Sequence, residues 1–141
     1  MTDARLFQWL NLAPMPGWAL LGIALFVPSV RPWAWTVAGV WLPAALAVAY
    51  GALVIARRDP VRGSFFSFDG VRSLFASPRV LLAGWTHFLA FDLFVGTWIA
   101  RTGVEANVHP LILAPLLGLT LMLGPLGYLG AVVVFAVTGA L

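Results

Sequence analysis

The chain has 141 residues, enough for one domain, which we expect to span residues 1–141. Hydrophobic residues make up 62% of it and charged residues only 9%, whereas an average soluble domain carries roughly 25% charged residues; an ordinary soluble fold is excluded. The net charge is +3, but the basic residues lie beside apolar segments, so we expect no nucleic-acid partner. The absence of cysteine excludes disulfides and thiolate metal sites.

The first residues form a mixed segment rather than an apolar one. Residues 1–13 combine leucine, phenylalanine and tryptophan with Arg5, Gln8 and Asn11, and Pro14 follows directly. This pattern predicts a short N-terminal interfacial helix. The same polar residues argue against a cleavable signal peptide.

Four apolar segments come next, and a helix needs about 20 such residues to cross a hydrocarbon layer of about 30 Å. The predicted spans are residues 15–31, 33–56, 80–100 and 109–138. The last is too long for a straight crossing, and Pro125 in its interior predicts a kink. Two half-helices separated at this proline are the alternative. The predicted fold is therefore an all-α integral membrane protein, a four-helix transmembrane bundle with a long, proline-kinked fourth helix.

Arginines predict the orientation of this bundle. The linker between the second and third spans holds Arg57, Arg58, Arg62, Arg72 and Arg79. The two linkers on the other side hold one arginine each, Arg31 and Arg101. Positive residues favour the cytoplasmic side, so both termini are expected there. No plastid transit peptide is recognisable, which indicates a bacterial inner membrane.

Two polar residues interrupt the third span, in "GWTHFLAFDLFVGTWIARTG", residues 84–103. A charged carboxylate such as that of Asp92 costs roughly 2.5–3.5 kcal/mol at the centre of a membrane helix, so such residues are functional hypotheses by default. His87 lies five residues earlier, about 140° around the helix and about 7.5 Å along it, which excludes a direct pair. A protonated, hydrogen-bonded Asp92 and a packed, neutral His87 are the structural alternatives.

Depth in the membrane suggests which residues surround this pair. Tyr50 and Thr120 lie at similar levels of the second and fourth spans, and His109 opens the fourth. Arg101 is better interpreted as the outer anchor of its span than as the counter-ion of Asp92. The candidate substrate-binding residues are Trp85, Phe88, Phe91, Trp98, Tyr50, Thr120, His109 and Arg101. Because the histidines and Asp92 lack metal-ligand spacing, no metal is expected.

Three stretches carry a resemblance to a known family. "FQWLNLAPMPGWALL", "GWTHFLAFDLFVGTWIARTG" and "HPLILAPLLGLTLMLGPLGYL" resemble the ABA DEFICIENT 4-like (ABA4-like) family, from Phe7 to about Leu129. The resemblance implies a four-helix membrane protein and a link to neoxanthin synthesis from violaxanthin. That reaction is an isomerisation that opens an epoxide and creates an allene.

An isomerisation of this kind requires an acid and a base and no redox cofactor, and we expect no cofactor. In this interpretation Asp92 is the candidate acid and His87 the candidate base or orienting group, although the roles could be reversed. The alternatives are a non-enzymatic carotenoid- or lipid-binding protein, an accessory subunit, and a proton-linked transporter subunit. Expected partners are the lipid bilayer, a carotenoid or other isoprenoid, and further copies of the chain in a homo-oligomer.

Overall fold

The computed structural model describes residues 2–56 and 63–140, and every regular element within these ranges is helical. In chain order the elements are α1 (Asp3–Leu12), α2 (Met15–Phe26), η1 (Pro28–Val30), α3 (Arg31–Thr36), η2 (Val37–Trp41), α4 (Leu42–Ile55), α5 (Phe68–Phe75), α6 (Pro78–Glu105) and α7 (Pro110–Thr138). Four helical segments are long and apolar enough to cross a membrane, namely Asp3–Phe26, Pro28–Ile55, Pro78–Glu105 and Pro110–Thr138. These helices confirm the predicted all-α membrane fold.

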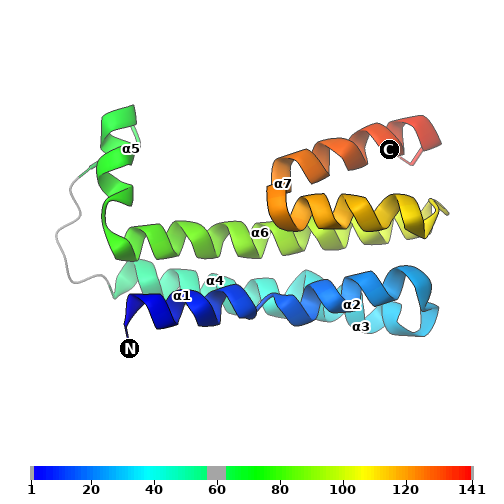
Figure 1. Ribbon diagram of the computed structural model, residues 1–141, viewed down its shortest axis with the longest axis horizontal. Helices are drawn as coiled ribbons and strands as arrows, with labels where there is room; N and C mark the ends of the chain where they lie inside the picture. Colours follow the sequence, from blue (N-terminus) through cyan, green and yellow to red (C-terminus); the bar gives the residue numbers. More distant parts are fainter. Residues whose placement is uncertain (1, 57–62, 141) are drawn as a thin grey trace.

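The expected short N-terminal helix is α1, and it continues nearly in line into α2 (Figure 1). Ala13 and Pro14 join the two helices and keep right-handed helical angles, so the chain changes direction little there. One side of α1 packs on α6 through the buried side chain of Leu10, which belongs to a cluster with Leu82 and Ala83. The N-terminal helix is thus part of the bundle.

The second segment contains a local widening of the helix at η2, which is a π-helical turn. The N–H of Leu42 bonds the carbonyl of Val37, five residues back. Pro43, the next residue, has no N–H and cannot close an ordinary helical bond to Gly39. The wider turn lets α3 and α4 continue as one long helical segment past this proline.

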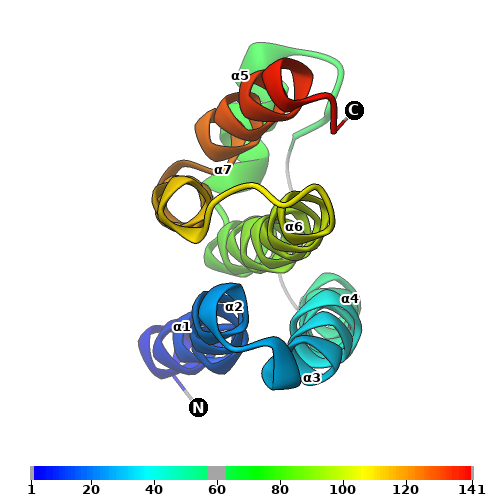
Figure 2. The same cartoon turned by 90° about the vertical axis from the view of Figure 1, so that its right-hand side faces the viewer.

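Helix α6 occupies the centre of the bundle. In the view along the bundle, α1 to α4 lie on one side of it and α7 on the other (Figure 2). The largest core cluster joins α2, α6 and α7 through the fully buried side chains of Leu21, Ile99 and Leu113. At the N-terminal end of α6 the short helix α5 runs across the long axis of the bundle (Figure 1). The Ser67 hydroxyl caps α5 by accepting a hydrogen bond from the N–H of Gly70 at 3.0 Å.

The fourth segment, α7, is kinked near the predicted proline, but the kink is so sharp that its two arms are half-helices, which is the alternative considered from the sequence. The backbone leaves helical geometry at Leu123 (φ −142°, ψ 57°), two residues before Pro125. The second arm then turns back beside the first (Figure 1). Gly127 makes this return possible, because a side chain there would collide with the backbone of Thr120. The first arm, residues 110–122, is only about 20 Å long at 1.5 Å per residue.

The return of the second arm places the two described ends of the chain at opposite ends of the bundle. Helix α1 begins at one end, whereas Thr138 lies near the end where α7 begins (Figure 1). The expectation that both termini are cytoplasmic assumed that the fourth helix runs the length of the bundle, and the orientation of the termini in the membrane stays a prediction. Three of the arginines behind that expectation, Arg57, Arg58 and Arg62, lie outside the described residues.

Candidate functional site

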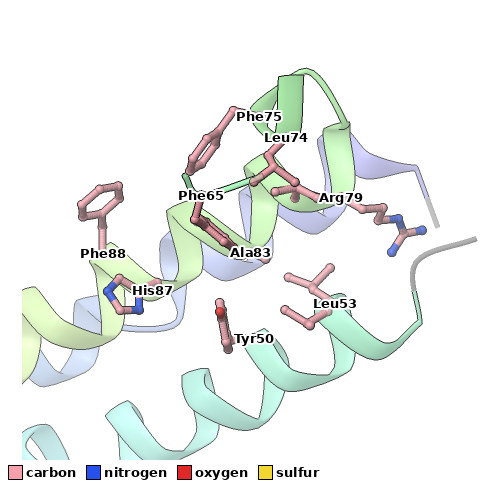
Figure 3. Close-up of a pocket in the computed structure, with 12 residues that line it drawn as sticks. Tyr50, Leu53, Phe65, Leu74, Phe75, Arg79, Ala83, His87 and Phe88 are labelled. Atoms are coloured by element: carbon pink, nitrogen blue, oxygen red, sulfur yellow. The ribbon is translucent and has the colours of Figure 1, made fainter. Parts of the chain in front are cut away.

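A cavity of about 450 Å³ lies between α4, α5 and α6, at the end of the bundle where α6 begins (Figure 3). Its walls are mostly apolar, with Leu53 from α4 and Phe75 from α5 among the side chains that line it. The ionisable side chains at the cavity are Tyr50, Arg79 and His87. The cavity is therefore an apolar chamber with a small number of groups that can bind or transfer a proton.

His87 is held between aromatic rings at the edge of this cavity. Its imidazole stacks on Phe91 with ring centroids 4.5 Å apart, and the ring of Tyr50 lies 6.1 Å away on α4. Among the described residues neither ring nitrogen of His87 has a hydrogen-bond partner. The close approach of Tyr50 agrees with the prediction from depth. Both side chains point toward the same space in Figure 3.

A second cavity, of about 330 Å³, follows along the same seam between α4 and α6. Pro43, Ala47 and Phe94 are among the residues that line it, and all of its lining side chains are apolar. Phe91 lines this second cavity and also stacks on His87 in the first. We call the two cavities together the α4–α6 groove. It extends along α6 from Arg79 to Phe94, which corresponds to about 22 Å of helix.

Asp92 lies on another side of α6, against the kink of α7. A Cβ atom at Gly124 would lie 2.9 Å from the carboxyl carbon of Asp92 and 3.3 Å from its Oδ2 atom. His87 thus faces α4 and Asp92 faces α7, in agreement with the angle of about 140° expected from their spacing. The structure does not bring the two candidate acid–base residues into one cavity.

Two other predicted residues also serve the packing of α7. The hydroxyl of Thr120 is buried and donates to the carbonyl of Leu116 at 2.8 Å, and its backbone contacts the second arm at Gly127. Trp98 packs against Tyr128 and Phe135 of that arm, with centroid distances of 5.6 and 5.5 Å. Thr120 and Trp98 are therefore not among the residues that line the α4–α6 groove.

The remaining predicted residues divide between the groove and other contacts. Phe88 and Phe91 line the groove, as expected. Trp85 instead faces α1, where its Nε1–H donates to Asn11 Oδ1 at 2.8 Å and its ring lies 5.9 Å from that of Phe7.

Arg101 and His109 lie at the far end of α6. Arg101 pairs with Glu105 at 2.8 Å on the exposed surface, as an anchor would. His109 caps α7 by accepting the N–H of Leu111 on Nδ1 at 3.3 Å. Neither side chain reaches the groove.

Sequence reasoning missed Arg79 as a site residue because it counted this arginine only as a charge of the linker. Arg79 lies eight residues before His87, about 80° around α6 and about 12 Å along it, and both side chains line the same cavity. Its guanidinium also pairs with Asp3 at 3.2 Å and so ties α1 to the start of α6. An offset of about 80° from His87 does not single out Arg79, and the contribution of α5 to the cavity also had no signal in the sequence.

Comparison with known proteins adds one finding. A family model described as ABA DEFICIENT 4-like matches residues 5–130, which include the α4–α6 groove, Asp92 and the kink of α7. Neither the curated proteins nor the solved structures contain a match to the chain.

Proposed function

The chain belongs to the ABA DEFICIENT 4-like family, and from this premise we propose that it acts on a carotenoid or related isoprenoid held in the α4–α6 groove. One observation carries the proposal: His87, which has no hydrogen-bond partner among the described residues, lines the first cavity and stacks on Phe91, which lines the second. A polyene along this seam would lie against Phe91 and Phe94 and place one end group beside His87. Mostly apolar walls with few polar groups are typical of sites for such ligands.

The proposed reaction is the isomerisation of an epoxide to an allene. A base removes a proton from the polyene carbon next to the epoxide ring. The electron pair of that C–H bond forms the new C=C bond of the allene, the epoxide C–O bond breaks, and the oxygen takes up a proton to become a hydroxyl. One proton leaves and one arrives, so neither an oxidant nor a reductant is required.

His87 is the proposed base and Tyr50 the proposed proton donor to the epoxide oxygen. Their ring centroids lie 6.1 Å apart, which is a direct aromatic contact, and both side chains line the cavity, so both can face one end group of a ligand held there. Asp92, the acid favoured from the sequence, faces Gly124 of α7 instead. In this proposal Asp92 positions the kink of α7 and does not touch the ligand.

A second candidate function is non-enzymatic binding of a carotenoid or another membrane isoprenoid. The separation of His87 from Asp92 favours it, because the strongest acid–base candidates do not meet. A protein that only holds a pigment requires the apolar seam and no proton transfer.

Pigment analysis tests the proposal, and the chain offers matched controls because it holds two histidines and two tyrosines. The wild-type protein and its variants are expressed in a host that makes epoxy-xanthophylls, and pigments are separated by chromatography. We expect an allenic product with the wild type and a loss of about 100-fold or more in His87→Gln and Tyr50→Phe. His109→Asn and Tyr128→Phe alter the other member of each pair, away from the groove, and should leave conversion unchanged.

Other outcomes have defined meanings. Pigment that copurifies with the wild type without conversion would establish the binder. Loss of conversion in Asp92→Asn, with pigment binding and the yield of folded protein intact, would return the acid role to Asp92. A wild-type protein that neither converts nor retains pigment would contradict both candidate functions.

A further inference from the structure

A separate hollow lies at the opposite end of the bundle from α5, where α6 ends and α7 begins. Its volume is about 230 Å³, and its polar lining side chains are Arg31, Asn107 and His109. They come from the start of α3, the C-terminus of α6 and the N-terminus of α7. The start of α3 and the connection between α6 and α7, two segments distant in sequence, therefore place polar side chains around one small space.

Arg31 is fixed in this hollow by one of its own hydrogen bonds. Its Nε–H donates to the carbonyl of Ala24 near the end of α2 at 3.1 Å, and the contact is partly buried. A guanidinium group has five N–H donors, so this bond leaves the four donors on the two terminal nitrogens. A fixed, planar pair of such nitrogens matches the oxygens of a phosphate group.

His109 offers a second donor because its cap determines the position of the ring proton. The N–H of Leu111 donates to Nδ1 at 3.3 Å, so this nitrogen carries no proton. The proton of the imidazole then resides on Nε2, which becomes a donor. The cap also orients the ring at the entrance of α7, beside the hollow.

Asn107 places its side-chain amide at the hollow, and the way in which α6 ends fixes the backbone of this residue. Its φ of 58° is left-handed, and the N–H of Val108 bonds the carbonyl of Gly103 at 2.8 Å, as in a Schellman helix end. Asparagine tolerates this conformation better than most residues. Because the backbone of Asn107 is fixed in this way, its amide side chain is held at the lining of the hollow.

Arg31 is the charged residue among the described side chains that line the hollow. No carboxylate is among its lining residues, and the nearest one in sequence, Glu105, pairs with Arg101 at 2.8 Å. We propose that this hollow binds a phosphate-type oxyanion through Arg31, Asn107 and His109. The anion is either the phosphodiester of a lipid headgroup or free phosphate. A hollow at the end of membrane-spanning helices lies near the level of lipid headgroups.

Variants that preserve the backbone test the site. Asn107→Gly keeps a residue suited to positive φ and removes the amide. His109→Asn keeps a good helix cap and removes the imidazole donor. Arg31→Gln removes the cation, and Arg101→Gln, which alters an arginine outside the hollow at the same end of α6, is the control.

Two measurements use the purified full-length protein and distinguish the sources of the anion. Native mass spectrometry measures retention of added phosphatidylglycerol, and thermal unfolding compares inorganic phosphate with chloride at equal ionic strength. We expect Arg31→Gln to lower the affinity about tenfold or more, Asn107→Gly and His109→Asn to lower it several-fold each, and Arg101→Gln to change it less than about twofold.

The two measurements distinguish a lipid headgroup from a free anion. Lipid retention that follows this order identifies a headgroup, and stabilisation by inorganic phosphate in the same order without lipid retention identifies a free anion. Equal losses in Arg31→Gln and Arg101→Gln would overturn the proposal, as would a wild-type protein that binds neither probe. Unchanged binding in both Asn107→Gly and His109→Asn would also overturn it, because these variants remove two of the three proposed donors.

Discussion

The two halves of α6 differ in how fully they are covered, although they belong to one continuous helix. In the first half, Phe88 and Phe91 are 57% and 56% exposed and line the α4–α6 groove. The first half has four buried residues, Leu82, Ala83, Thr86 and Ala90. The second half has six, namely Leu93, Gly96, Thr97, Ile99, Ala100 and Gly103. The difference arises because α7 turns back at Leu123 and covers only the second half. The place where α7 turns back thus determines which half of α6 is covered on that side, whereas the groove lies on the side of α6 that faces α4.

The largest expected effect compares the burial of the two halves. Ile99→Ala removes a fully buried side chain from the core and should lower the free energy of unfolding by about 3 kcal/mol. Leu81→Ala, in the first half, alters a side chain that is 53% exposed and should cost less than about 1 kcal/mol. Unfolding titrations in mixed micelles measure both values. Equal losses would show that the first half is as tightly packed as the second.

One glycine in each half of α6 allows a second comparison of their packing. A methyl group at Gly96 would lie 2.6 Å from the indole ring of Trp18, which is packed against the core. Gly96→Ala should therefore destabilise the fold by about 1–3 kcal/mol. Gly84→Ala would place a methyl equally close to Phe75, but that ring is partly exposed and can rotate away. We expect a smaller loss for Gly84→Ala in thermal unfolding, and the reverse order would contradict this account.

A smaller effect is expected where the first half of α6 meets α1. Trp85→Phe removes the hydrogen bond to Asn11 and keeps an aromatic ring, so the free energy of unfolding should fall by about 1 kcal/mol. Asn11→Ala should have a similar effect, and the double variant should lose little more than either single one. Fully additive losses in this cycle would show that the hydrogen bond contributes nothing to stability.

The smallest effect concerns the ion pair at the beginning of α6. Asp3→Asn breaks the contact with Arg79. Both side chains of this ion pair are partly exposed, so the free energy of unfolding should fall by less than about 1 kcal/mol. The loss should shrink as salt is added, since salt screens exposed charges. Melting curves at low and high salt measure it. A large loss that does not depend on salt would contradict the exposed character of the pair.

Composition and periodicity were sufficient to predict the helices, because apolar runs of spanning length have few alternatives. The angle between His87 and Asp92 was also predictable, since it follows from helix geometry alone. The return of α7 was not, because a proline signals a kink but does not specify its size. Close contact between the arms depends on Gly127 and Thr120, seven residues apart, and this pairing has no local signature.

The candidate site could also be predicted only in part from the sequence. Tyr50 could be placed near His87 from depth, whereas Thr120 at a similar depth turned toward the second arm of α7. Depth determines the level of a side chain in a bundle but not the neighbour that it faces. That choice depends on the rotation of each helix about its axis, which packing across the whole interface sets.

The hairpin of α7 also leaves part of α6 uncovered. The first arm of α7 packs on the second half of α6, whereas the first half carries half-exposed side chains such as Phe88 and Phe91 and borders a groove with α4 beside it and α5 at its end. In a bilayer, exposed apolar side chains of a membrane-spanning helix contact lipid chains and not water. We therefore expect a hydrophobic ligand to reach His87 by lateral diffusion within the membrane and not from water.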